Sequence, residues 1–336
     1  MNIFFEKSIK NFFSDAIIYG LTNILQKFFT LFTIFFIAKN ISINDFGLYD
    51  FILALINFVV IFISFGQESA IARYFYEYEN NDDRIKLISE SFLIHIFFLI
   101  FFYFFIFTSF YFDFFNYFIK NLNINKNLFY LFLLNIPFFL IYNFCINILR
   151  WNFQKFEYLY LAIGLSLSLL LLIIFQNFFF EINLNNLFSV YFFVYFFFSI
   201  NAFYFVKKWI KIPKKYINLS KIFKFAYPFG LIAIFSIAVT LLERIYIFNN
   251  LNLKDLAIYA MAVKVSLIAH IFTQSFNMSW GPSAFKNFKK NEFDKLSNLI
   301  LKIYLVISLI VMAFILTLGE RIILFISSEK YLDSYN

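Results

Sequence analysis

The side chains most able to do chemistry in this sequence are polar ones set inside long apolar stretches. Asn23, Gln26 and Lys27 recur at three- and four-residue spacing, which places them on one face of a helix. A lysine in the middle of a stretch that crosses a membrane costs several kcal/mol unless it forms an ion pair or faces water. Lys27 is therefore either a cation in a water-filled cavity, suited to phosphate or an acidic sugar, or a structural partner of Asp15 or Asp50.

Two further cations lie inside apolar stretches near the carboxyl-terminal third of the chain. Glu243 and Arg244 are adjacent, so on a helix they point about 100° apart and form no good pair with each other. Lys264 is a candidate partner for Glu243. Because an arginine offers a planar fork to phosphate oxygens, Arg244 could line a substrate cavity. The alternatives are an ion-pair network between helices and an interfacial position without a special role. The same three interpretations hold for Lys264.

A further group of charges is suited to an ion pair or a gate, and it consists of Asp50, Glu68, Arg73 and Glu243. Glu68 and Arg73 follow directly after the second long apolar stretch. Arg73 is interpreted either as a positive anchor at the cytoplasmic surface or as one side of a gate. In the second case Glu68 or a neighbouring acid would close the gate against it.

No constellation typical of an enzyme accompanies these residues. The sequence has no Gly-rich phosphate loop followed by a lysine, no Gly-x-Ser-x-Gly elbow and no His/Cys spacing typical of a metal site. Its single cysteine, Cys145, excludes an internal disulfide. We therefore expect no enzyme activity and no cofactor, while coupling to H⁺ or Na⁺ is left open.

The elements that must hold these residues are membrane-spanning helices. With 62% apolar and 25% aromatic residues and a mean hydropathy of +0.78, the chain has too little polar surface for a water-soluble domain. The apolar stretches are continuous rather than alternating, which predicts an all-α, polytopic helical membrane protein. Nine spans are predicted, at residues 16–38, 46–66, 88–112, 128–149, 158–176, 187–206, 225–248, 256–276 and 298–318.

The basic residues predict how the chain crosses the membrane. The side that holds the amino terminus carries 19 Lys and Arg residues and the opposite side six, so the amino terminus is predicted to be cytoplasmic. Residues 207–224 hold seven lysines and Pro213, which stops a helix from running through. We interpret them as a cytoplasmic basic linker, and we expect no nucleic acid partner.

The chain also repeats itself at an offset of 210 residues. Residues 16–81 aligned without gaps on 226–291 share 15 identities in 66 positions, where this composition gives roughly six by chance. The repeat predicts an amino-terminal six-span lobe at residues 1–206 and a second lobe at 225–336. The second lobe is expected to be truncated after its third span, because Asn336 aligns with Lys126, just before the fourth. We therefore expect an incomplete version of a carrier with two pseudo-symmetric lobes.

Six short motifs lie near the ends of the predicted spans. They are Tyr19-Gly20-Leu21, Asp45-Phe46-Gly47-Leu48-Tyr49, Gly66-Gln67-Glu68-Ser69-Ala70-Ile71-Ala72-Arg73-Tyr74, Glu243-Arg244-Ile245-Tyr246, Tyr259-Ala260-Met261-Ala262-Val263-Lys264 and Phe276-Asn277-Met278-Ser279-Trp280-Gly281-Pro282. In this order and spacing they resemble those of the Wzx-type polysaccharide flippases, members of the multidrug/oligosaccharidyl-lipid/polysaccharide exporter superfamily.

The resemblance implies two six-helix lobes around a central cavity in the bacterial cytoplasmic membrane. It implies transport of an undecaprenyl-diphosphate-linked oligosaccharide to the periplasmic leaflet by alternating access, for O-antigen lipopolysaccharide, capsule or a related polymer. The implied partners are this lipid-linked oligosaccharide, the phospholipid bilayer and other polysaccharide-assembly membrane proteins. A diphosphate and sugar hydroxyls need a wet, cationic cavity. The candidates to line it are Asn23, Gln26, Lys27, Arg244 and Lys264.

Three other functions remain as alternatives. A multidrug-type exporter of small molecules shares the fold, and a cavity lined by carboxylates and aromatic rings would favour it. A membrane polysaccharide polymerase is disfavoured, since the predicted periplasmic loops are too short to hold its site. A membrane scaffold without transport activity is the third.

Overall fold

The computed structural model describes residues 2–111, 125–213, 216, 218–266, 293–326 and 329–335. Within these residues all regular structure is helical and no strand occurs, which confirms the predicted all-α class. The helices are α1 (Asn2–Asn40), α2 (Ile43–Ser64), α3 (Gln67–Glu77), α4 (Asn81–Tyr111), α6 (Lys126–Trp151), α7 (Lys155–Phe179), α8 (Leu184–Val206), η1 (Lys207–Trp209), α9 (Leu219–Asn250), α11 (Phe293–Ile326) and η2 (Glu329–Tyr335). Residues 253–266 are also helical.

Eight of the described helices are long and apolar enough to cross a membrane. Their spanning parts contain 22 to 32 residues, and at about 1.5 Å per residue each exceeds the roughly 30 Å hydrocarbon core. They coincide with eight of the nine predicted spans. The remaining predicted span, 256–276, lies partly outside the described residues, and the motif at 276–282 lies wholly outside them. Length and composition thus indicate a multi-pass membrane protein.

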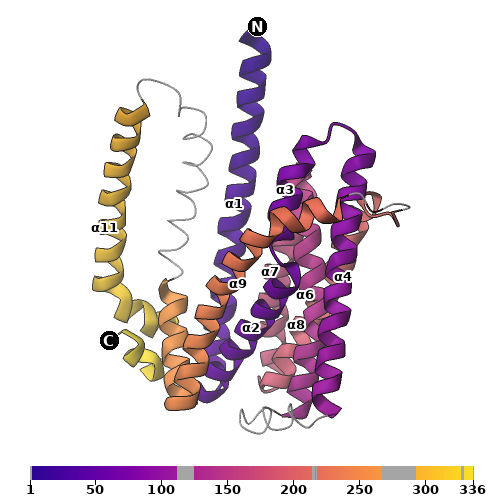
Figure 1. Ribbon diagram of the computed structural model, residues 1–336. Coiled ribbons are helices and arrows are strands. Elements are labelled where there is room, and N and C mark those ends of the chain that lie inside the picture. Colours follow the sequence, from indigo (N-terminus) through magenta and orange to yellow (C-terminus); the bar gives the residue numbers. More distant parts are fainter. Residues whose placement is uncertain are drawn as a thin grey trace. The chain divides into compact units, whose positions relative to one another are not determined.

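Figure 1 labels the helices of the chain. The chain divides into two compact units: the larger unit is Tyr49–Asn250, and the smaller one combines Met1–Leu48 with Leu251–Asn336. These units are groups of mutually contacting residues. The lobes and the basic linker expected at 1–206, 207–224 and 225–336 therefore stay predictions, as does the pseudo-symmetric arrangement of two lobes.

In the larger unit α8 packs against both α6 and α7. Helix α6 continues through Pro137, although a proline has no N–H to offer the carbonyl group of Leu133, four residues earlier. The hydroxyl group of Tyr103 in α4 donates to that carbonyl oxygen at 2.6 Å. The neighbouring Asn135 donates across to the carbonyl oxygen of Phe188 in α8 at 3.2 Å. The Tyr103 side chain of α4 therefore satisfies the carbonyl group that the proline leaves without a donor, and Asn135 links α6 to α8.

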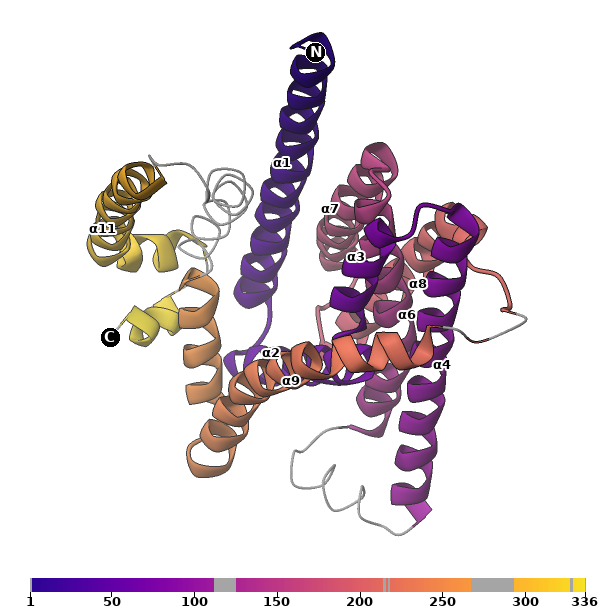
Figure 2. The ribbon, with the colours of Figure 1, turned by 45° about the horizontal axis from the view of Figure 1, so that its top comes forward.

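A close approach of two glycines joins α3 to α9, which Figure 2 shows lying against each other. Gly66, just before α3, has a φ of 68°, in the left-handed region that favours glycine. A Cβ atom on Gly66 would lie 2.6 Å from the carbonyl oxygen of Ala226 and would overlap the backbone of Gly230. A Cβ atom on Gly230 would lie 2.7 Å from the carbonyl oxygen of Phe65. The two backbones approach this closely only because neither residue has a side chain.

In the smaller unit the short helix η2 packs against the carboxyl end of α1. The Lys330 ammonium group donates to the carbonyl oxygen of Ile41 at 2.7 Å, where the negative end of the α1 dipole favours a cation. Tyr331 is fully buried, donates to the carbonyl oxygen of Ala38 at 3.3 Å, and meets the ring of Phe46 edge to face. These contacts fix η2 against the end of α1 and the start of α2. Helix η2 is not one of the candidate spans.

The ends of α1 and α9 follow the 210-residue repeat. Helix α1 ends at Asn40 and α9 at Asn250, which are aligned in the repeat. The Asn40 side chain donates to the carbonyl oxygen of Phe36 at 2.8 Å, and the Asn250 side chain donates to that of Tyr246 at 2.9 Å. Repeated residues therefore make the same local contact in both halves of the sequence.

The starts of the helices that follow are also equivalent. They begin at residues 43 and 253, and each is capped by the residue before it. The backbone N–H of Asp45 donates to the Ser42 hydroxyl oxygen at 3.1 Å, and that of Asp255 donates to the Asn252 side-chain oxygen at 2.9 Å. Such caps satisfy N–H groups that the first helical turn leaves without partners. The sequence repeat is thus a repeat of local structure.

Candidate functional site

A buried ion pair joins α2 and α9 inside the larger unit. The Arg244 Nε atom lies 2.7 Å from Asp50 Oδ2, and the two side chains are 7% and 1% exposed. Arg244 Nη1 also donates to the carbonyl oxygen of Thr240 at 2.7 Å. Asp50 is seven residues after the start of α2 and Arg244 is six residues before the end of α9. At about 1.5 Å per residue both lie roughly 10 Å from their helix ends, within the spanning segments.

The energetics of such a pair make it a specific contact between helices. Removing two charges from water costs several kcal/mol per ion, and mutual attraction offsets this only with good geometry and further hydrogen bonds. Asp50 and Arg244 have both. Of the interpretations of Arg244, the geometry therefore supports the ion pair between helices. An anionic ligand at Arg244 would have to compete with the Asp50 carboxylate.

An aromatic cluster lies beside this pair and consists of Tyr49, Phe139, Phe188, Tyr191 and Tyr195. The hydroxyl oxygens of Tyr49 and Tyr191 are 2.6 Å apart in a hydrogen bond between buried groups. The rings of Phe139 and Tyr195 stack with centroids 3.5 Å apart. The sequence analysis named Tyr49 within a motif but did not single out the other four, because in a chain with 25% aromatic residues no single ring stands out.

The other candidates for a cationic cavity belong to the smaller unit. Asn23, Gln26 and Lys27 are half-buried on α1, and the helix places them on one face as their spacing predicts. Lys264 is half-buried in the helical residues 253–266. Since Arg244 belongs to the larger unit, a cavity shared by these three cations stays a prediction. Glu243 is exposed, one residue from the buried Arg244.

The two gate candidates that follow α2 have different partners in the structure. Arg73 pairs with Glu77 on its own helix at 3.1 Å, and both side chains are at least half exposed. Glu68 instead accepts a hydrogen bond from Asn147 and lies near Arg150. Burial raises the pKa of the Glu68 carboxyl group, and these two neighbours oppose that shift. The acid that pairs with Arg73 is therefore its neighbour Glu77 rather than Glu68, and a gate at this position stays a prediction.

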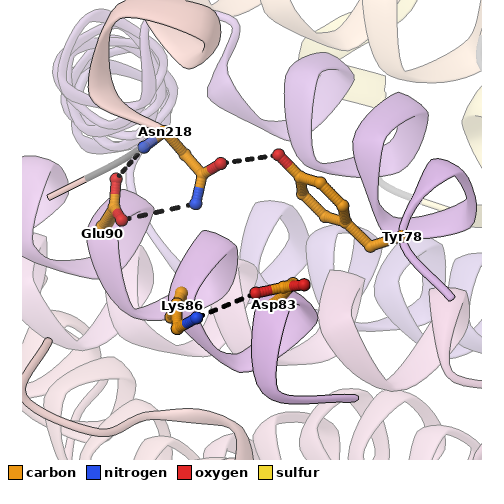
Figure 3. A network of polar contacts seen from close by, with 5 residues as sticks. All are labelled: Tyr78, Asp83, Lys86, Glu90 and Asn218. Carbon is orange, nitrogen blue, oxygen red and sulfur yellow. Dashed lines mark hydrogen bonds and ion pairs between the residues drawn. The ribbon is translucent and has the colours of Figure 1, made fainter. Parts of the chain in front are cut away.

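Figure 3 shows a polar network that the sequence analysis missed. Glu90 in α4 is fully buried, and its carboxylate accepts from the backbone N–H of Asn218 at 2.7 Å and from the Asn218 side chain at 3.3 Å. The Tyr78 hydroxyl group donates to the Asn218 side-chain oxygen at 2.6 Å. Asn218 directly precedes α9, so a negative charge lies at the positive end of that helix dipole.

This network joins the basic segment to α4 within the larger unit. Ser89, next to Glu90, accepts from the backbone N–H of Lys211 at 2.8 Å, and Trp209 is buried with its ring 5.8 Å from that of Phe75. The feature of the sequence that could have indicated this network is an acid, Glu90, at the start of the predicted span 88–112. A buried acid in such a place requires donors from elsewhere in the chain.

The repeat provides a further signal, because the intramembrane charges occur in only one of its two copies. Each stands opposite an apolar residue at the 210-residue offset: Asp50 opposite Ala260, Arg244 opposite Ile34, Lys27 opposite Ile237 and Lys264 opposite Ala54. A helical scaffold common to both copies does not need these charges. They are therefore better candidates for function than residues that the two copies share.

Three comparisons with known proteins complete the description of the site. No family model, no curated protein and no solved structure matches this chain. The described residues contain no group of His, Cys, Asp and Glu that could hold a metal ion. The chain's own charges, contacts and internal repeat are therefore the basis for a proposed function.

Proposed function

We propose that this chain is a carrier of the flippase type, which moves an undecaprenyl-diphosphate-linked oligosaccharide across the bacterial cytoplasmic membrane by alternating access. The observation that supports it is the ion pair between Asp50 and Arg244 inside two spanning helices. Ionisable residues at such depth are costly and are found mainly on substrate and ion paths. Internal repeats of spans are a common construction of secondary transporters. The amino terminus is proposed to be cytoplasmic, as the distribution of Lys and Arg predicts.

In this proposal the diphosphate competes with Asp50 for Arg244. A diphosphate carries more negative charge than one carboxylate and offers oxygens that fit the guanidinium fork. When the diphosphate replaces Asp50, the contact that joins α2 to α9 is lost. A ligand shifts a conformational equilibrium by as much as it binds one state more tightly than the other. Exchange at Arg244 would thus link substrate binding to a movement of these two helices.

Export of surface glycan in a strain that lacks its own flippase tests the proposal. The chain should restore export, whereas Arg244→Ala should reduce export more than it reduces the amount of protein in the membrane. Arg244→Lys should restore export only in part, because the planar fork is lost. The exchanged pair Asp50→Arg with Arg244→Asp should recover protein abundance without export. Normal export by Arg244→Ala at normal abundance would remove Arg244 from the substrate path.

A multidrug-type exporter is the second candidate. The observation that favours it is the position of the Asp50 carboxylate next to Tyr49 of the aromatic cluster, since carboxylates and aromatic rings bind organic cations. Efflux of a lipophilic cationic dye from cells distinguishes the two. An exporter should require Asp50 and tolerate Arg244→Lys, whereas a glycan flippase should produce no dye efflux.

A further inference from the structure

An open groove lies between α7 and α8 in the larger unit, apart from the ion pair and the polar network. Its cavity volume is 510 Å³, within the range of roughly 300–1,000 Å³ usual for small-ligand sites. Leu172, Phe175 and Phe193 form apolar walls, and Gln176, Asn186 and Ser189 are its polar lining residues.

The polar residues of the groove lie towards the helix ends that meet at the turn 180–183, where Phe179 and Phe180 also line it. Helix α7 has 25 residues, about 37 Å of helix against a hydrocarbon core of roughly 30 Å. Gln176 is three residues before the end of α7, and Asn186 is the third residue of α8. Leu172 and Phe193 lie further from those ends. Phe175 and Phe193 are 60% and 63% exposed, so in a membrane the medium in contact with these walls is lipid.

One end of the groove holds a buried acceptor without a hydrogen-bond donor. Gln176 Oε1 is buried and has no hydrogen-bond partner among the described residues. The side chains of Asn186 and Ser189 already donate to backbone carbonyl oxygens, those of Glu181 at 3.4 Å and Asn185 at 2.8 Å. A buried acceptor without a donor is costly, so a ligand that donates a hydrogen bond at this position would be stabilised.

The charges at this end favour a cationic donor. None of the residues that line the groove is Lys or Arg, so an anionic head group would find no counter-ion on its walls. The turn between α7 and α8, residues 180–183, has one charged residue, Glu181, and it is exposed. Phe175 and the neighbouring rings offer their faces to a cation at the same depth.

We propose that this groove binds one phospholipid with a primary ammonium head group, of the phosphatidylethanolamine type. One acyl chain lies along Leu172, Phe175 and Phe193, and the ammonium group donates to Gln176 Oε1 near Glu181. Phosphatidylcholine presents the same chain but no N–H donor, and phosphatidylglycerol adds a net negative charge that nothing in the groove neutralises. This site is separate from the proposed substrate path, so it stands or falls independently of the flippase proposal.

Native mass spectrometry of the purified, delipidated protein tests this site directly. Phosphatidylethanolamine, phosphatidylcholine and phosphatidylglycerol with matched acyl chains are titrated in turn. The first should bind about tenfold more tightly than the others, the factor expected for one hydrogen bond to a charged group. Gln176→Leu should abolish that preference, and Val190→Trp, which fills the groove, should reduce binding of all three lipids. The melting temperature of each variant checks that it folds.

Asn201→Leu is the matched control. Asn201 lies in α8, the other helix that borders the groove, but it does not line the groove, and its side chain donates only to the carbonyl oxygen of Phe197 at 2.8 Å. It should keep the phosphatidylethanolamine preference. Equal binding of the three lipids by the unmodified protein would overturn the proposal, and so would an unchanged preference in Gln176→Leu.

Discussion

The guanidinium group of Arg244 and the carboxylate of Asp50 lie 2.7 Å apart although 194 positions separate them in the sequence. This contact joins the second spanning helix of the chain to the seventh candidate span, and both side chains are almost completely buried. Charges buried this deeply are costly unless they are paired, so the pair makes sharp predictions.

Removal of one partner of this pair should destabilise the protein strongly. Arg244→Ala leaves the Asp50 carboxylate buried without its counter-ion, and such changes cost about 3–5 kcal/mol. The double variant Asp50→Leu with Arg244→Met should regain most of that loss, because apolar residues of similar size replace a buried pair at little cost. Thermal unfolding in detergent measures both. Glu243→Gln, an exposed neighbour, is the control and should change stability little.

The close approach of α3 and α9 should not tolerate a side chain. Gly66→Ala introduces a Cβ atom 2.6 Å from the carbonyl oxygen of Ala226, at a φ of 68°. We expect a loss of about 2–4 kcal/mol from the clash and the left-handed backbone together. Gly20→Ala is the matched control, since no atom lies within 4 Å of its added Cβ. It should be neutral or stabilise α1 by up to about 1 kcal/mol. Similar melting temperatures for the two variants would contradict the packing at Gly66.

Loss of the Glu90 carboxylate, which contacts the start of α9, should destabilise the protein far more than loss of the nearby surface ion pair between Asp83 and Lys86. Glu90→Ala leaves two buried N–H donors of Asn218 without acceptors, which costs about 1–3 kcal/mol. Hydrogen exchange of the backbone amides of residues 207–222 should become faster. Asp83→Ala removes the ion pair with Lys86, where both side chains are about 40% exposed, and should cost at most about 1 kcal/mol. Figure 3 shows both contacts. Equal exchange rates in the two variants would show that Glu90 does not hold this segment.

The hydroxyl groups of Tyr49 and Tyr191 should stabilise the larger unit only as a pair. Tyr49→Phe or Tyr191→Phe alone leaves one buried hydroxyl group without its partner and should cost about 1–3 kcal/mol. The double variant should cost less than the sum of the two, with a coupling energy of about 0.5–3 kcal/mol. A double-mutant cycle of unfolding free energies measures it. Strict additivity would mean that the 2.6 Å contact contributes nothing.

The sequence by itself determined the class of protein and the positions of its helices. Eight predicted spans coincide with helices of the structure, because about 20 consecutive apolar residues form a helix wherever they cross a membrane. The predicted spans end at residues 38 and 248, two residues before α1 and α9 end at Asn40 and Asn250, and the contacts that form at these ends involve residues within one helical turn. Such contacts depend on the neighbouring sequence alone, so a repeated sequence reproduces them.

Only the tertiary structure decided which polar residues meet. The sequence marked Asp50 and Arg244 as charges that need partners, but it did not identify them as partners of each other. It gave no sign that Glu90 would meet Asn218, or that Gly66 would meet Gly230. The two hydrogen-bonded pairs, Glu90 with Asn218 and Asp50 with Arg244, are 128 and 194 positions apart in the sequence. Their formation depends on how α4, α2 and α9 pack, and packing is set by the shapes of many side chains together rather than by any local pattern.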